Sequence, residues 1–192
     1  MAEFNKIVHD KVKKIIEEGR VALMLGGDRS VGLGTVIGRL TADPDCVSIW
    51  VDVHADINTI SSSNSGNIHS MPISFNIKQL EEPFPNSKLG WLEPSVNSCR
   101  IVYIGLIDVE KEEKKTLTRL NISAFYMPEV DMIGIVRVVE EALKIVDPLG
   151  QRNNHISFDI DSLAPLEAPA TGTPVRGGLS LREVHHPMSV IV

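Results

Sequence analysis

Acidic and imidazole side chains follow two apolar segments that are typical of buried strands. Asp52, His54 and Asp56 come after the first segment, and Asp159 and Asp161 come after the second. Parallel strands align their C-terminal ends along one edge of a sheet, so side chains distant in sequence can converge there on a metal ion. The pattern predicts a metal site. The alternative interpretation is that these residues are only turn formers or helix caps.

The order of elements that would position these side chains indicates an α/β fold. Apolar residues at helical spacing predict a first helix that Gly19 terminates. Strands are expected at residues 21–25, 47–51, 99–106, 123–127 and 155–160, and helices at residues 3–18, 30–41, 73–80, 111–120 and 132–145. Small residues in the second helix would let it pack closely on the sheet. Alternating strands and helices are typical of a parallel sheet with helices on its faces.

Composition limits the class of protein. The chain has 192 residues, of which 43% are hydrophobic and 23% are charged, which is typical of a single domain over residues 1–192. A net charge of -6 argues against nucleic-acid partners. The sequence lacks both a signal-peptide pattern and an apolar run of membrane-spanning length, so we expect a cytoplasmic protein with no membrane partner. The isolated Cys46 and Cys99 suggest neither a disulfide framework nor a cysteine-based zinc site.

Five short motifs occur in order along the chain. They are Gly-Gly-Asp-Arg-Ser at 26–30, Asp-Val-His-Ala-Asp-Ile-Asn at 52–58, Ser-Gly-Asn-Ile-His at 65–69, Ser-Phe-Asp-Ile-Asp at 157–161 and Pro-Ala-Thr-Gly-Thr-Pro at 169–174. Together they resemble the arginase family of binuclear manganese ureohydrolases. The resemblance implies a three-layer αβα fold around a parallel sheet. It also implies hydrolysis of the small-molecule substrate L-arginine to L-ornithine and urea.

The resemblance also implies a metal-ligand set for two Mn²⁺ ions. Asp52 and Asp159 would bridge the ions, Asp56 would complete the shell of one ion, and His54 with Asp161 would complete that of the other. A guanidinium is a poor electrophile, so its hydrolysis needs a strong nucleophile at neutral pH. Water that bridges two cations is acidified enough to supply hydroxide.

Catalytic and substrate-binding residues follow from the same resemblance. The implied catalytic residues are Asp56 and His69, and His69 corresponds to a histidine that protonates the departing amine of ornithine. The implied substrate contacts are Asn58, Ser65 and Asn67 for the α-carboxylate, Glu110 for the α-amino group and Thr173 for the guanidinium end. Each of these also has a plainer interpretation as a loop or turn residue.

Arg29 departs from the family pattern, because family members have a metal-binding histidine at this position. A guanidinium has no lone pair to donate and stays protonated, so it would repel a nearby cation. One interpretation is that Arg29 pairs with Asp52, Asp56 or Asp159 and replaces the charge of one ion. In the other interpretation, Arg29 points into solvent.

The chain is also shorter than family members. By resemblance it lacks the first strand, the last two strands and the C-terminal carboxylate that pairs with the substrate guanidinium. His185, His186 and Pro187 interrupt an expected final helix. We therefore expect an incomplete arginase-like domain with unpaired strand edges, and the family's homotrimer cannot be inferred for it. Two functions stay open: an arginase-type hydrolase with reduced or lost activity, and a non-catalytic homologue that acts as a truncated pseudoenzyme or interaction partner.

Overall fold

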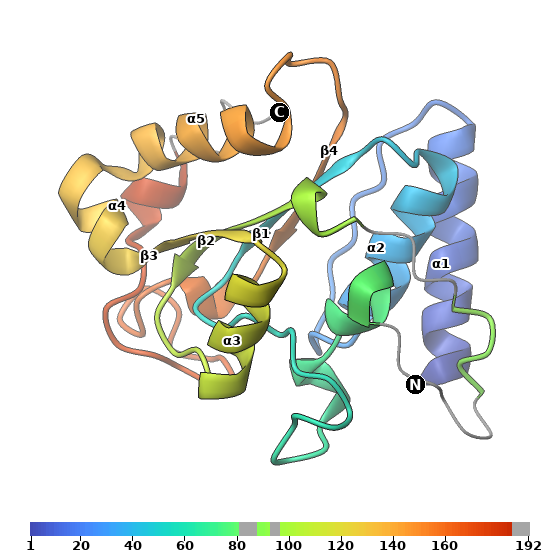
Figure 1. The fold of residues 1–192 in the computed structure, drawn as a ribbon, viewed down its shortest axis with the longest axis horizontal. Helices are drawn as coiled ribbons and strands as arrows, with labels where there is room; N and C mark the ends of the chain where they lie inside the picture. The colour runs from blue at the N-terminus through green and yellow to red at the C-terminus, as the bar shows by residue number, and fades with distance from the viewer. Residues whose placement is uncertain (81–87, 93–96, 186–192) are drawn as a thin grey trace. The chain divides into compact units, whose positions relative to one another are not determined.

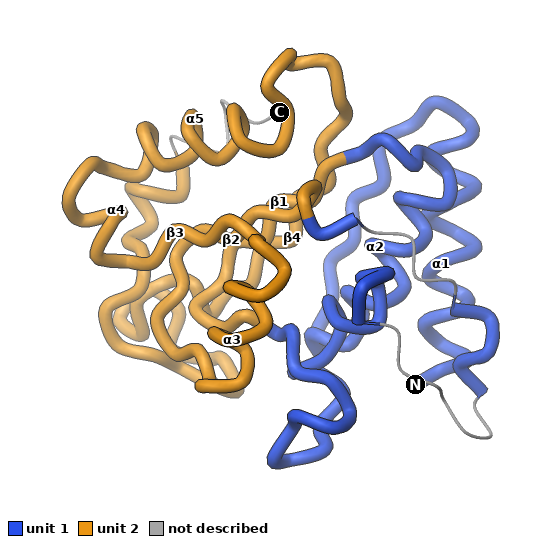
Figure 2. Tube along the Cα trace, viewed as in Figure 1, with its two compact units in different colours: residues 1–46, 56–98 blue, residues 47–55, 99–192 orange. Residues whose placement is uncertain are grey.

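The computed structural model describes residues 1–80, 88–92 and 97–185. The chain divides into two compact units, shown in different colours in Figure 2. Unit 1 comprises Met1–Cys46 and Asp56–Ser98, and unit 2 comprises Val47–Ala55 and Cys99–Val192. A single domain over the whole chain therefore stays a prediction. The expected interruption at His186 and Pro187 lies outside the described residues.

Unit 2 is built on a parallel four-stranded sheet with the strand order β3-β2-β1-β4 (Figure 1). The strands are β1 at Val47–Val51, β2 at Ile101–Leu106, β3 at Ser123–Tyr126 and β4 at Asn154–Phe158. β1 lies between β2 and β4, and its Ile49 stands opposite Val102 on one side and Ile156 on the other. Every residue of β1 is buried, as expected for a central apolar strand of a parallel sheet. The predicted α/β fold with a parallel sheet is confirmed.

The helices of unit 2 include α3 at Lys111–Arg119, α4 at Met127–Ile133 and α5 at Ile135–Val146, and residues 181–185 are also helical. The sequence predicts one helix over residues 132–145, but the structure has two helices that meet at Gly134. Gly134 has a φ of +81°, a left-handed conformation that glycine adopts without steric cost and that ends α4. α5 then packs its buried apolar stripe into the core cluster that contains the strand residues of β1 and β2. This packing fixes the sheet that carries Asp52.

In unit 1, helices α1 (Ala2–Glu17) and α2 (Val31–Ala42) pack at very close range. A Cβ on Gly34 would lie 2.5 Å from the Asn5 backbone oxygen, and one on Gly38 would lie 2.7 Å from the His9 backbone oxygen. The fully buried Asn5 also accepts a hydrogen bond of 3.0 Å from the Gly34 N–H. The prediction that these small residues pack on the sheet is wrong for both glycines, because their missing side chains make room for α1.

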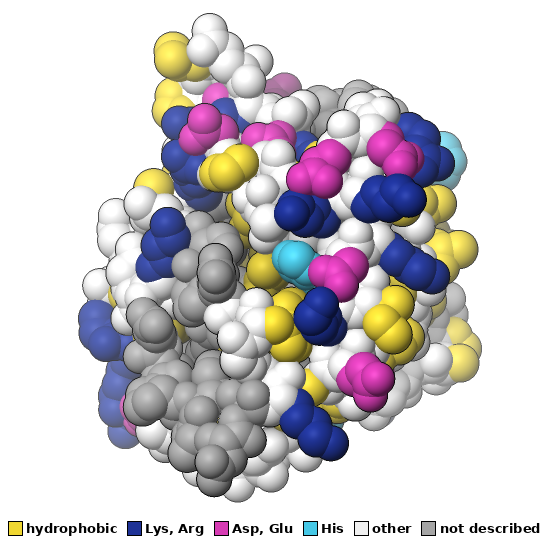
Figure 3. Space-filling model, turned by 90° about the vertical axis from the view of Figure 1, so that its right-hand side faces the viewer, with side chains coloured by type: hydrophobic (Ala, Val, Ile, Leu, Met, Phe, Trp, Pro, Cys, Tyr) yellow, Lys and Arg dark blue, Asp and Glu magenta, His cyan; other side chains and the backbone are white. Residues whose placement is uncertain are grey.

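The exposed surface of α1 carries charges of both signs at helical spacing. Lys6 pairs with Asp10 at 3.0 Å, and Lys13 pairs with Glu17 at 3.6 Å. The face of the molecule in Figure 3 likewise intersperses basic with acidic side chains and shows no continuous basic patch. Within the described part of the chain, no helix is both long enough and apolar enough to cross a membrane.

The segment at residues 21–25, predicted as a strand, is not one. Val21, Leu23 and Leu25 are between 83% and 92% exposed, and the segment forms no regular element. Among the described residues no strand pairs with it, and an extended segment without a neighbour gains neither ladder hydrogen bonds nor burial. The apolar pattern is present, but no strand in the described part of the chain pairs with this segment.

The helix predicted over residues 73–80 is replaced by two short 3₁₀ turns, Ser74–Asn76 and Lys78–Leu80. The Ser74 hydroxyl donates to the Met71 carbonyl at 2.9 Å, and the Asn76 amide donates to the Pro72 carbonyl at 2.7 Å. Short polar side chains that bond to nearby backbone compete with a regular helix. The prediction of a continuous helix is therefore wrong here.

Candidate metal centre

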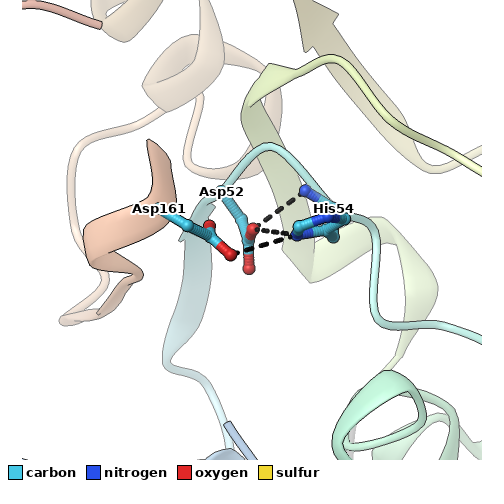
Figure 4. A group of neighbouring side chains, drawn as sticks. All are labelled: Asp52, His54 and Asp161. Carbon is cyan, nitrogen blue, oxygen red and sulfur yellow. Dashed lines mark hydrogen bonds and ion pairs between the residues drawn. The ribbon is translucent and has the colours of Figure 1, made fainter. Parts of the chain in front are cut away.

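Asp52, His54 and Asp161 bring their side chains together in unit 2 (Figure 4). Asp52 and His54 follow β1, while Asp161 lies in the 3₁₀ turn Ile160–Ser162 that follows β4. β1 and β4 are parallel and in register through their last residues. The segments that follow both strands therefore leave the sheet at the same edge, as expected for a site in an open parallel sheet.

The three side chains are arranged as donors to a single point. His54 Nδ1 lies 3.2 Å from Asp161 Oδ2 and 3.5 Å from Asp52 Oδ1, and one ligand atom from each residue lies within 4.8 Å of the others. The side chains of Asp52 and Asp161 are 1% and 5% exposed. A small divalent cation with bonds of about 2.1 Å holds neighbouring ligand atoms about 3 to 4 Å apart. Two buried carboxylates and one imidazole thus fit such an ion in both chemistry and spacing.

Neighbouring groups hold the two carboxylates in place. Asp52 Oδ1 accepts a hydrogen bond of 2.8 Å from the His54 backbone N–H, and Asp52 Oδ2 accepts one of 3.2 Å from the Trp50 indole N–H. Asp161 Oδ2 accepts a hydrogen bond of 3.0 Å from the Thr173 hydroxyl. Partners of this kind fix the orientation of metal ligands and tune their affinity.

Trp50 is a site residue that our sequence reasoning missed. A signal was available, because residues two apart on a strand point to the same face, and Trp50 is two residues before Asp52. Thr173 was expected to line the guanidinium end of the substrate. In the structure, the Thr173 hydroxyl donates to Asp161, one of the three possible metal ligands. A contact between Thr173 and a substrate stays a prediction.

Asp159 was expected to bridge two ions, and the structure gives it a local role. Its Oδ1 accepts a hydrogen bond of 2.9 Å from the Asp161 backbone N–H, and its own N–H donates to the Val51 carbonyl at 2.9 Å. Asp159 therefore caps the turn that carries Asp161 and ties that turn to the end of β1. It is not one of the three clustered side chains, so its bridging role stays a prediction.

In unit 1, Arg29 forms an ion pair with Asp56. The Arg29 Nε–H donates to Asp56 Oδ2 at 3.0 Å, and the two side chains are only 13% and 9% exposed. The interpretation in which Arg29 points into solvent is therefore wrong. Asp56 was also expected to bind metal and to take part in catalysis, and both roles stay predictions.

The other predicted residues of unit 1 lie on and beside one polar loop. Asn58 is buried, and its side-chain oxygen accepts a hydrogen bond of 3.2 Å from the Ser62 hydroxyl. Ser65, Asn67 and His69 are exposed, and the Ser65 hydroxyl accepts from the Asn67 backbone N–H at 3.2 Å. The last of them, His69, sits on a short 3₁₀ turn at Ile68–Ser70. Their roles toward a substrate stay predictions.

Glu110, in unit 2, is the residue from which α3 begins. Its backbone N–H donates to Glu113 Oε2 at 3.0 Å, which is one half of a capping box. Its side chain is exposed, and its expected contact with a substrate α-amino group stays a prediction.

Comparisons with known proteins identify the family of the chain. The model of the arginase family matches residues 1–191. The arginase of Eremothecium gossypii is 46% identical over 183 residues, and the match covers 95% of this chain and 46% of that protein. Arginase-1 of Sus scrofa is 46% identical over 180 residues, with 93% of this chain and 56% of that protein covered. The chain thus spans about half the length of these curated relatives.

Solved structures give the same result. A cold-adapted arginase from the yeast Glaciozyma antarctica matches with a TM-score of 0.88 and 40% identity over 99% of this chain and 65% of that one. The Entamoeba histolytica arginase in complex with L-ornithine matches with a TM-score of 0.85 and 30% identity over 96% and 62% of the two chains. With a family match over nearly its whole length, the chain belongs to the arginase family.

Proposed function

We propose that this chain is an arginase-type ureohydrolase that acts on L-arginine, with Mn²⁺ bound at Asp52, His54 and Asp161. The observation that carries the proposal is the convergence of two buried carboxylates and an imidazole at the end of β1 in a member of the arginase family. Relatives are named arginases, and one solved relative is a complex with L-ornithine. L-Ornithine and urea are the expected products.

The ligand set supports a divalent cation of the Mn²⁺ type, because carboxylate oxygens suit hard ions and an imidazole nitrogen is accepted by borderline ones. When bound, such a cation supplies Lewis-acid chemistry, which lowers the pKa of water enough for attack on a guanidinium at neutral pH. The Thr173 hydroxyl and the Trp50 indole would keep Asp161 and Asp52 aimed at the ion. Asp159 would hold the turn on which Asp161 lies.

His69 is proposed as the group that gives a proton to the departing amine. Its exposed imidazole on a short turn after the polar loop is accessible to solvent, from which a spent proton can be replaced. Histidine suits this role because its ordinary pKa lies near physiological pH.

Polar groups of the chain are proposed to orient the amino-acid end of the substrate. Asn58, Ser65 and Asn67 offer amide and hydroxyl donors to the α-carboxylate, and Glu110 offers an anion to the α-amino group. In the free protein, Asn58 and Ser65 form hydrogen bonds within their own loop. Binding of the substrate would exchange some of these bonds for bonds to the carboxylate.

Urea release from L-arginine by the purified chain, with and without Mn²⁺, tests the proposal. We expect release only with Mn²⁺, and its loss in Asp161→Asn. Asp131→Asn is the matched control, because it makes the same change in an exposed side chain of α4. Mn²⁺-independent release, or release unchanged by Asp161→Asn, would contradict the proposed site.

A second function is favoured by the Arg29–Asp56 ion pair. In this alternative the chain is a non-catalytic family member that binds a cation without hydrolysing arginine, because a fixed guanidinium stands where the family has a metal ligand. Mn²⁺ binding that Asp161→Asn abolishes, together with no urea release from the wild-type chain, would establish this alternative.

A further inference from the structure

We propose that Arg29 replaces one of the two metal ions of the arginase family, so that this chain binds a single divalent cation. The cation site is the Asp52, His54 and Asp161 group, and the inference rests on the proposed function for that assignment. In unit 1, Asp56 is the anion of a built-in ion pair and not a metal ligand.

The contact between Arg29 and Asp56 is the first argument. The guanidinium Nε–H donates to Asp56 Oδ2 at 3.0 Å, and neither side chain is more than 13% exposed. A guanidinium is charged at every pH at which the protein folds, and it has no lone pair to offer a metal. The carboxylate therefore already has the positive charge that an ion would bring. A cation beside it would also be repelled by Arg29.

The backbone on both sides of the pair is held, which is the second argument. Arg29 precedes α2, and the buried Ser30 donates to Asp28 Oδ1 through its N–H and to Asp28 Oδ2 through its hydroxyl, both at 3.0 Å. The Asp56 carbonyl accepts a hydrogen bond of 3.1 Å from the Ile73 N–H. These bonds hold the backbone from which the two side chains extend. To release Asp56 to a metal, the chain would have to break the contact between this carboxylate and a largely buried guanidinium.

The third argument is that the Asp52, His54 and Asp161 group and the Arg29–Asp56 pair contain different types of donor. The Asp52, His54 and Asp161 group presents an imidazole nitrogen that can give a lone pair to a metal, at 3.2 and 3.5 Å from two carboxylates. In the Arg29–Asp56 pair, the carboxylate already accepts a hydrogen bond from a guanidinium, which has no lone pair for a metal. One group of three possible metal ligands and one carboxylate that pairs with arginine therefore predict a single ion per chain.

Mn²⁺ stoichiometry, measured by equilibrium dialysis with elemental analysis of the full chain, is the test. We expect one ion per chain for the wild type and two for Arg29→His, because the substitution removes the cation, adds a lone pair and frees Asp56. Arg29→Lys is the matched control, since it retains the positive charge and should retain one ion. The Mn²⁺ EPR spectrum of the wild type should be that of an isolated ion without exchange coupling.

A second pair of variants tests the inference without removing Arg29. Asp56→Asn should leave one Mn²⁺ per chain, whereas the same change at Asp161 should abolish binding. Circular dichroism on each sample confirms that it is folded. Two ions on the wild type, or loss of the single ion in Asp56→Asn, would overturn the inference and leave the proposed function standing. No Mn²⁺ on either the wild type or Arg29→His would overturn both.

Discussion

Asp52 and Asp56 belong to one short motif, but the structure gives their carboxylates different partners. Asp52 lies with His54 and Asp161 in a group of metal-ligand type, whereas Asp56 pairs with the guanidinium of Arg29. Both carboxylates are buried and so need positive charge nearby. We infer that the first obtains it from a bound ion and the second from the chain itself.

The difference shows what a ligand motif leaves undetermined. Residue types and spacing identify side chains that are able to bind a metal, but a residue elsewhere in the chain decides whether a given carboxylate is available. Here that residue is Arg29, which is 27 positions before its partner. Predictions that separate the two groups follow, beginning with the largest expected effect.

Removal of the Arg29 guanidinium, the positive charge that pairs with Asp56, should have the largest effect on stability. In metal-free buffer, Arg29→Met should lower the free energy of unfolding by about 3 to 5 kcal/mol, because it removes the guanidinium that pairs with the buried Asp56 carboxylate. Urea denaturation followed by circular dichroism measures the change. Adding Asp56→Asn to Arg29→Met should recover part of the loss. A loss below about 1 kcal/mol would mean that the Arg29–Asp56 pair stabilises the fold no more than an exposed ion pair does. That result would weaken the contrast drawn between Asp52 and Asp56.

Addition of Mn²⁺ should stabilise the folded chain through the Asp52, His54 and Asp161 group. Mn²⁺ at about 100 times its dissociation constant should raise the free energy of unfolding by about 2.7 kcal/mol, because the ion binds only the folded chain. A chelator should reverse the shift in melting temperature. Asp161→Asn should remove the response, and Asp131→Asn should keep it. A full Mn²⁺ response in Asp161→Asn would place the ion elsewhere.

A weaker effect is expected from the hydroxyl that orients Asp161. Thr173→Val removes the donor at 3.0 Å from Asp161 Oδ2 with little change in side-chain shape. Mn²⁺ affinity should fall about 10- to 100-fold, as is typical when a partner of a metal ligand is lost. Isothermal titration calorimetry measures it. Thr171→Val, in the same turn, should bind as the wild type does, and equal losses in both variants would indicate a general effect on the turn.

Much of the fold could be predicted from the sequence, because its central elements have strong local patterns. The apolar run of β1 and the periodicity of α1 depend on burial that neighbouring residues supply, and both elements formed where expected. The segment at residues 21–25 has a pattern as apolar as that of β1 but is exposed. Strand formation depends on pairing with a distant segment, and a local pattern contains no information about that partner.

The candidate site could be predicted only in part for the same reason. The motifs indicated Asp52, His54 and Asp161 as ligands, and the structure brings these three together. The motifs did not determine which acid Arg29 pairs with, because the sequence was compatible with Asp52, Asp56 and Asp159. Within unit 1, the segment before α2 and the segment that begins at Asp56 bring Arg29 Nε to 3.0 Å from Asp56 Oδ2. A local motif contains no information about such a contact between distant segments.

The smallest expected effect concerns Asp147, whose carboxylate is stabilised mainly by backbone hydrogen bonds, with a smaller contribution from the charge of Arg152. The Arg152 backbone N–H donates to the exposed Asp147 at 2.8 Å, and the Gln151 N–H donates at 3.2 Å. The first of these bonds is the main reason that the pKa of Asp147 lies below its ordinary value of 3.8, although some desolvation opposes the shift. A lowered folded-state pKa contributes stability that is present above the unfolded-state pKa and is lost as the pH falls through the folded-state pKa.

Asp147→Asn should therefore lower the melting temperature slightly at pH 7, and the difference from wild type should shrink as the pH falls below about 4. Differential scanning fluorimetry across this pH range measures it. The charge on Asp147 is neutralised by neither Mn²⁺ nor Arg29, so the shift should be the same with a chelator present. A difference that stays constant with pH would mean that the carboxylate acts only through the shape of its hydrogen bonds, and that charge compensation matters only at the two buried groups.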